Sequence, residues 1–159
     1  MLSSRNIKNS LTVLSRAQNL LQRSKDANNL RDKISRGYYA CYHACVAAVL
    51  LKGSFDYNSP TGSPHRAVRE RYRSLYSTKA GQIVKIGDYN KTMVSWKTLR
   101  ESADYEIYTK DFEILGENRT YEVLDDMYDF VDKHLVYIQN LIPESSKHLF
   151  DYELKFLQE

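Results

Sequence analysis

Residues 35–53, SRGYYACYHACVAAVLLKG, have apolar side chains around nearly the whole circumference of the helix that they predict. One side of this helix would carry Ile34, Tyr38, Cys41, Cys45 and Ala48, and another side would carry Tyr39, Val46 and Leu50. A helix without a polar face is normally enclosed by other helices. This segment therefore predicts the central helix of a bundle.

The length and composition of the chain agree with that architecture. Its 159 residues are enough for one domain with a single core, and six glycines and three prolines are few for a fold with many turns. Residues that favour helices recur throughout the sequence. We therefore expect an all-α bundle of about four or five helices over residues 1–142, followed by a tail over residues 143–159 that forms a short helix.

Apolar periodicity places the remaining helices along the chain. It predicts helices over about residues 4–23, 30–52 and 120–142, another that begins at Pro64, and another from about residue 88 that carries Trp96, Leu99, Ala103 and Ile107. Residues 54–64 are rich in Ser, Pro, Gly and Asn and predict a loop, whereas residues 79–88 predict an extended connector.

The tail after Pro143 has its own apolar side, made of Leu149, Tyr152 and Phe156. Such a stripe on a short helix needs a surface to cover it. Two alternatives remain open at this stage, since the stripe would dock either on the bundle or on a partner.

The composition also excludes several classes of protein. No run of about twenty apolar residues lacks charge, and the N-terminus has no hydrophobic stretch with a cleavage-like site, so we expect a cytoplasmic protein with no membrane anchor. In such a reducing compartment, Cys41 and Cys45 would be small buried hydrophobes rather than a disulfide. The glycines form no phosphate-binding loop, and the four histidines lack the spacing of a metal site. We therefore expect no metal or cofactor.

Arg36 and His43 are the polar exceptions in the apolar helix. They are seven residues apart, which puts them on nearly the same face at a separation of about 10 Å, so both side chains could reach one phosphate between them. An unpaired arginine inside a bundle is costly, and the alternative for Arg36 is therefore a bridge to Asp104 that fixes two helices in register. For His43 the alternative is a core histidine that bonds a backbone carbonyl or a tyrosine hydroxyl.

A basic segment follows the first loop. Residues 64–79 carry five basic side chains, at Arg66, Arg69, Arg71, Arg73 and Lys79, with Tyr72 and Tyr76 between them. Basic residues interleaved with aromatics are typical of a surface that meets a phosphate backbone. In the alternative interpretation, the arginines form a solvated face while Ala67, Val68, Tyr72, Leu75 and Tyr76 point to the core.

Three motifs in order resemble a known family. The segment YYACYH at Tyr38–His43, the segment SPHRAVRERY with its His65, and the segment LRESADYEI with Arg100, Ala103, Asp104 and Tyr105 resemble the small stand-alone members of the HEPN (higher eukaryotes and prokaryotes nucleotide-binding) family. Tyr42 stands where phenylalanine is usual, and the resemblance extends from the first helix to Ile142. It implies an up-and-down helical bundle that forms a homodimer.

The resemblance also implies a function. Several HEPN proteins are metal-independent endoribonucleases in toxin–antitoxin or phage-defence systems, and they use an arginine followed, after about four to six residues, by a histidine. Arg36 and His43 fit that spacing and are the expected catalytic residues, and RNA is the expected substrate. Tyr39, His65, Arg100, Asp104 and Tyr105 are the expected binding residues.

The best-known nucleases of the family carry the Arg–His motif on a later helix, and here the later helix with Arg100 contains no histidine. A second function is therefore open: a non-catalytic module that binds RNA or a nucleotide and is the partner of a nucleotidyltransferase or an antitoxin. A purely structural dimerising module is the third.

Overall fold

A computed structural model describes residues 2–56, 62–76, 82–84, 89–105 and 116–157, with only the backbone of residues 89–90 and 117–118 described. The elements in chain order are α1 (Ser4–Lys25), α2 (Leu30–Lys52), α3 (Pro64–Tyr76), α4 (Tyr89–Asp104), α6 (Glu117–Asn140), the 3-10 helix η2 (Glu144–Phe150) and α7 (Asp151–Lys155). Within these ranges the structure contains helices and no strands. The predicted all-α bundle with a short C-terminal helix is therefore confirmed.

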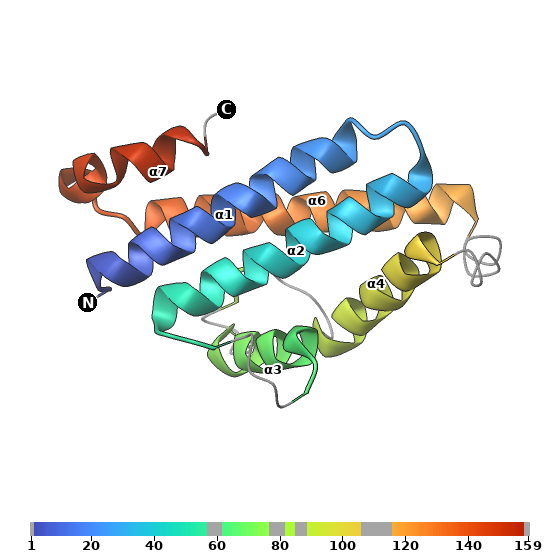
Figure 1. Cartoon of the computed structure of the whole chain (residues 1–159), viewed down its shortest axis with the longest axis horizontal. Coiled ribbons are helices and arrows are strands. Elements are labelled where there is room, and N and C mark those ends of the chain that lie inside the picture. Colours follow the sequence, from blue (N-terminus) through green and yellow to red (C-terminus); the bar gives the residue numbers. More distant parts are fainter. Residues whose placement is uncertain (1, 57–61, 77–81, 85–88, 106–115, 158–159) are drawn as a thin grey trace.

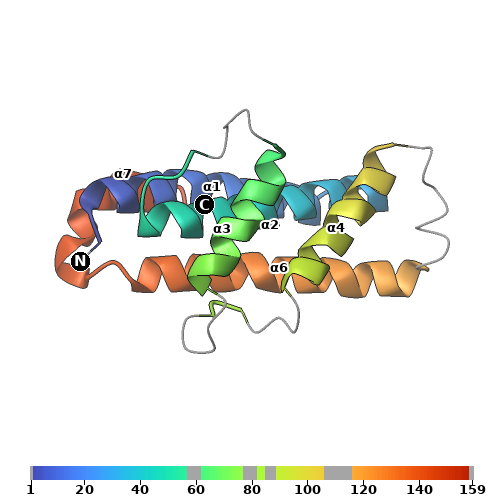
Figure 2. The ribbon, with the colours of Figure 1, turned by 90° about the horizontal axis from the view of Figure 1, so that it is seen from below.

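Helix α2 is the centre of the bundle. It packs against α1, α3, α4 and α6, and most of its apolar side chains are buried. In Figure 1, α1 lies on one side of α2, and α3 and α4 lie on the other. Figure 2 shows α3 and α4 crossing the long α2 and α6 at an angle. The helix without a polar face thus occupies the enclosed position that the sequence predicts for it.

The helix boundaries follow from residues that cap the ends. Ser3 precedes α1, and its hydroxyl accepts a hydrogen bond from the Asn6 amide at 3.1 Å. Asn29 caps α2 in the same way, because its side-chain oxygen accepts from the Asp32 amide at 2.8 Å. The predicted starts of both helices are confirmed. The predicted connector at residues 79–88 and the position of Ile107 fall mostly outside the described residues.

Helices α1 and α2 run antiparallel, and side-chain hydrogen bonds fix their register. The Ser10 hydroxyl donates to the Ala47 carbonyl at 2.8 Å, and the Ser24 hydroxyl donates to the Lys33 carbonyl at 2.6 Å. Both serines are fully buried. Close to Ser24, Gly37 of α2 also lies against α6, because a Cβ on Gly37 would lie 3.2 Å from the Met127 sulfur of α6. The register determines which side chains of α1 lie next to which side chains of α2.

The C-terminal tail packs against α1 with a different face from the one expected. Phe150 and Leu157 are buried in the main core, whereas Leu149, Tyr152 and Phe156 are exposed. Glu153 is also buried, and its carboxylate lies 3.5 Å from the Lys8 ammonium. Docking of the Leu149 stripe on the bundle is therefore wrong, because the 3-10 turn of η2 rotates that stripe away from α1. Docking on a partner stays a prediction.

The basic helix α3 uses its aromatic residues for the core. Val68, Tyr72 and Tyr76 are buried, and the Tyr76 hydroxyl donates to the Ala48 carbonyl of α2 at 2.7 Å. Arg66 is exposed and pairs with Glu70 one turn later at 2.8 Å. The interpretation of α3 as a solvated basic face over a buried aromatic face is confirmed for the described residues of the segment. Contact of this face with a phosphate backbone stays a prediction.

Candidate functional site

The first predicted catalytic residue, Arg36, caps the end of α1. Its Nη1 donates to the carbonyl oxygen of Arg23 at 3.1 Å, and its Nη2 lies 3.5 Å from the Asp32 carboxylate one turn earlier. The Arg23 carbonyl belongs to the last turn of α1, where carbonyls lack a partner within the helix and attract cations. Arg36 therefore holds the C-terminus of α1 against α2.

The proposed bridge between Arg36 and Asp104 does not form. The Asp104 carboxylate accepts instead from Nη1 of Arg100, one turn earlier on α4, at 3.1 Å. Arg36 thus pairs with Asp32 within α2, and Arg100 pairs with Asp104 and, at 3.7 Å, with Glu101 within α4. This expectation from the sequence is wrong, because helical spacing already supplies each arginine with a local partner.

The second predicted catalytic residue, His43, is half-buried at the surface of α2. Its ring meets the Tyr42 ring edge-on at 5.5 Å, and within the described part of the chain its nitrogens have no hydrogen-bond partner. It is therefore not held as the carbonyl-bonded core histidine that the sequence left open. Burial and then the positive charge of Arg16 lower the pKa of His43, so the imidazole is neutral at pH 7.

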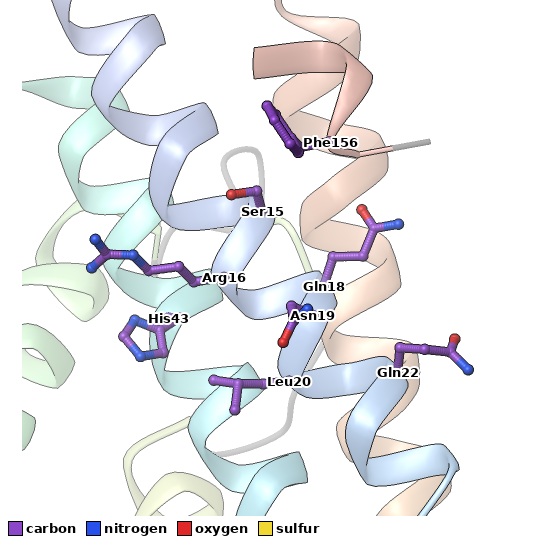
Figure 3. Close-up of a pocket in the computed structure, with 8 residues that line it drawn as sticks. All are labelled: Ser15, Arg16, Gln18, Asn19, Leu20, Gln22, His43 and Phe156. Carbon is purple, nitrogen blue, oxygen red and sulfur yellow. The ribbon is translucent and has the colours of Figure 1, made fainter. Parts of the chain in front are cut away.

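A polar groove runs past His43 along the outer face of α1. It encloses about 560 Å³ and is lined by Ser15, Arg16, Gln18, Asn19, Leu20, Gln22, His43 and Phe156. Figure 3 shows Arg16 and His43 together on one side of α1, Gln18 and Gln22 on the other, and Phe156, the residue that follows α7, at one end. Hydroxyl, amide, imidazole and guanidinium groups thus border one open space.

The antiparallel register brings Arg16, Arg36 and His43 to one border of the α1–α2 pair, where the Arg23 backbone also lies. Arg36 bonds to the Arg23 backbone, and two turns along each helix Arg16 and His43 line the same groove. Arg16 and Arg23 are exposed and form no ion pair with any residue that the structure describes. Tyr39 lies on α2 between Arg36 and His43 and is half-buried. We call Arg16, Arg23, Arg36, Tyr39 and His43 the α1–α2 edge.

The other predicted binding residues gather around Arg100. The guanidinium carbon of Arg100 lies 5.6 Å from the ring centre of Tyr38 and 5.4 Å from that of Tyr39, distances typical of cation–π contacts. The Tyr38 hydroxyl and the His65 Nδ1 are 2.9 Å apart. Burial and the nearby positive charges of Arg100 and Lys97 lower the pKa of His65 to about 4. This group is therefore a neutral histidine beside a buried cation.

The structure unites most of the predicted binding residues. Tyr39, His65, Arg100 and Asp104 form one connected group, and Tyr39 also belongs to the α1–α2 edge. Tyr105 is exposed at the end of α4. Arg100 is only 7% exposed, and its Nε has no hydrogen-bond partner among the described residues.

Sequence reasoning missed Arg16 and the amides of the groove. The available signal was weak, because Arg16 is one of several basic residues on the solvated side of a periodic helix. Only the register between α1 and α2 places it next to His43. Sequence reasoning also passed over His134, which is fully buried on α6 and bonds Tyr72 and the Phe130 carbonyl.

Two features of the described residues bear on the expected class of protein. No three His, Cys, Asp or Glu side chains come together in them as a set of metal ligands. None of the helices in this part of the chain combines the length and the apolar composition that crossing a membrane requires.

Comparisons with protein-family models, with curated proteins and with solved structures found no match to this chain.

Proposed function

We propose that this protein is a metal-independent endoribonuclease of the HEPN type, with His43 as the general base. The observation that carries the proposal is a neutral imidazole that borders a polar groove beside the guanidinium of Arg16, where neither group has a hydrogen bond or ion pair to the described residues. The motif order in the sequence and the all-α bundle support the family assignment. A role as a toxin or a phage-defence effector follows from the same resemblance.

The groups at the groove match the needs of RNA cleavage without a metal. A neutral histidine removes the proton from a ribose 2′-hydroxyl, and the 2′-oxygen then attacks the adjacent phosphorus. The bond between phosphorus and the 5′-oxygen breaks, and the leaving oxygen takes a proton from water while the imidazolium returns its proton to solvent. A guanidinium stabilises the negative charge that grows on the phosphate oxygens. The products are a 2′,3′-cyclic phosphate and a 5′-hydroxyl.

The surroundings of His43 favour a single-stranded substrate. Unpaired bases bind proteins by stacking on aromatic rings and by hydrogen bonds to their edges. Tyr39 lies between Arg36 and His43 along α2, and the amides of Gln18, Asn19 and Gln22 border the groove. RNA loops and ends are therefore the expected targets.

Cleavage of RNA in the presence of a chelator tests the proposal. Purified protein is incubated with total RNA and with tRNA in excess EDTA, beside the His43→Ala variant and a His148→Ala control, since His148 is exposed on η2 and does not line the groove. We expect cleavage by the wild type and the control, cyclic phosphate ends by mass spectrometry, and a loss of at least about 100-fold in His43→Ala. Full activity in His43→Ala, or activity abolished by EDTA, contradicts the proposal.

A second candidate function rests on the Arg100 group. The buried guanidinium of Arg100 faces Asp104 and Glu101, but its Nε has no partner among the described residues and could bind an anion beside the rings of Tyr38 and Tyr39. In this alternative the bundle binds RNA or a nucleotide without cleaving it and pairs with a nucleotidyltransferase or an antitoxin, or with a second copy of itself. Binding of RNA without any cleavage, lost in Tyr39→Ala but kept in His43→Ala, would favour this alternative.

A further inference from the structure

We infer that Arg16 of α1, rather than Arg36, is the residue that binds the phosphodiester next to His43. This inference rests on the proposed function, because it names the phosphate-binding group of the same site. It assigns the binding role to a residue outside the Arg–His spacing in the sequence. The ligand chemistry is a phosphodiester of single-stranded RNA.

The position of Arg16 is the first argument. Arg16 and His43 come from two different helices and line one groove, and the close-up shows the two side chains on the same side of α1. A phosphate that accepts hydrogen bonds from the guanidinium would place the neighbouring ribose near the imidazole. The hydrogen bonds of Ser10 and Ser24 fix the register of the two helices, so this proximity is part of the fold.

The availability of the guanidinium is the second argument. Arg16 is exposed and has no ion pair or hydrogen bond to any residue in the described ranges, so its planar group can form two bonds to one phosphate. Arg36 differs, since it already bonds the Arg23 carbonyl and faces Asp32. Recruiting Arg36 would break the cap of α1, whereas recruiting Arg16 breaks nothing in the described structure.

Binding of a non-cleavable RNA tests the inference separately from catalysis. The probe is a fluorescent single-stranded oligonucleotide with 2′-O-methyl riboses, which lacks the nucleophile, and anisotropy is measured at several salt concentrations. The variants are Arg16→Ala and Arg16→Lys, with Arg5→Ala as the control, because Arg5 is an exposed arginine on the same helix outside the groove. Circular dichroism verifies that every variant is folded.

We expect Arg16→Ala to weaken binding about tenfold and to reduce the slope of log affinity against log salt by about 0.7, the value for one phosphate contact on a single strand. Arg5→Ala should change affinity less than about twofold, and Arg16→Lys should keep the salt slope but lose part of the affinity. Arg36→Ala, at temperatures where it is folded, should bind nearly as well as the wild type.

The outcomes separate the two proposals. A wild type that binds the probe through Arg16 but cleaves no RNA overturns the proposed ribonuclease and upholds the phosphate site. A wild type that cleaves RNA, with Arg16→Ala indistinguishable from Arg5→Ala in binding, upholds the ribonuclease and overturns the inference about Arg16. A loss of binding in folded Arg36→Ala equal to that in Arg16→Ala also overturns it, and a wild type that does not bind the probe overturns both.

Discussion

Tyr72 and His134 share a hydrogen bond in the centre of the bundle, with the tyrosine oxygen 2.7 Å from Nε2 of the imidazole. The other ring nitrogen, Nδ1, lies 2.6 Å from the Phe130 carbonyl. A carbonyl only accepts, so Nδ1 carries the proton and Nε2 accepts from the tyrosine hydroxyl. The geometry thus selects one tautomer of the neutral ring, and full burial disfavours the imidazolium.

This contact predicts a loss of stability in mild acid. Burial lowers the pKa of His134 to about 4, whereas an unfolded histidine titrates near 6.5. Between those two pH values the imidazole is protonated in the unfolded chain but not in the folded protein. The free energy of unfolding therefore falls as the pH drops from 7 to 4, by roughly 3 kcal/mol for this residue alone. His65, with its pKa of about 4, acts in the same direction.

Urea denaturation at a series of pH values from 7 to 4.5 measures this dependence. His134→Gln should flatten the pH profile in part, because His65 still contributes, whereas His148→Gln on the exposed side of η2 should leave it unchanged. A wild-type profile that is flat over this range would contradict the assignment of both histidines as neutral.

The second prediction concerns the electrostatic link between Arg16 and His43. The charge of Arg16 is one of the two causes that lower the pKa of His43, so Arg16→Ala should raise that pKa towards its ordinary value. Arg5→Ala removes the same charge from the same helix and should have no effect. The titration of the His43 ring protons by NMR measures both. Identical curves in the two variants would show that the side chains are not neighbours in solution.

The third prediction separates the structural role of Arg36 from its expected catalytic role. Arg36→Ala removes the hydrogen bond to the Arg23 carbonyl and should lower the free energy of unfolding by about 1 kcal/mol. Arg66→Ala is the matched control, since the pair of Arg66 with Glu70 is exposed and such pairs contribute little. Thermal unfolding compares the two variants. Equal midpoints would mean that the contact of Arg36 with α1 does not stabilise the bundle.

The fourth prediction compares two phenylalanines of the tail. Phe150 is 3% exposed, and Phe150→Ala should destabilise the protein by about 3 kcal/mol through loss of burial and a residual cavity. Phe156 is 45% exposed, and Phe156→Ala should cost well under about 1 kcal/mol. Chemical denaturation measures both. A large loss of stability in Phe156→Ala but not in Phe150→Ala would instead support docking of the Leu149 stripe on the bundle.

The sequence was sufficient for the fold because the signals there are local and redundant. The apolar circumference of α2, the apolar periodicity of the other helices and the loop composition of residues 54–64 each act over a few residues. The candidate site depends instead on relations between helices. His43 was found because histidine is rare in an apolar run, whereas Arg16 becomes a candidate only through the register that Ser10 and Ser24 impose.

The prediction of which face of the tail docks on the bundle was wrong for a related reason. Leu149, Tyr152 and Phe156 have helical spacing, and the spacing alone does not say that a 3-10 turn precedes α7 and changes the side that meets α1. The buried face uses Phe150, Glu153 and Leu157 instead, and a glutamate is not recognisable as a core residue before its lysine partner is in place.

Neither cysteine of the chain, Cys41 or Cys45, forms a disulfide, and both are fully buried in the central helix. Burial raises the pKa of Cys41 well above its ordinary value, so the thiol resists reagents that attack thiolates. Alkylation of these sulfurs therefore requires separation of α2 from its neighbours, whereas the α1–α2 edge lies at the surface. The rate of thiol labelling therefore measures how often the core opens. Binding of a ligand at the groove should not expose the two thiols directly.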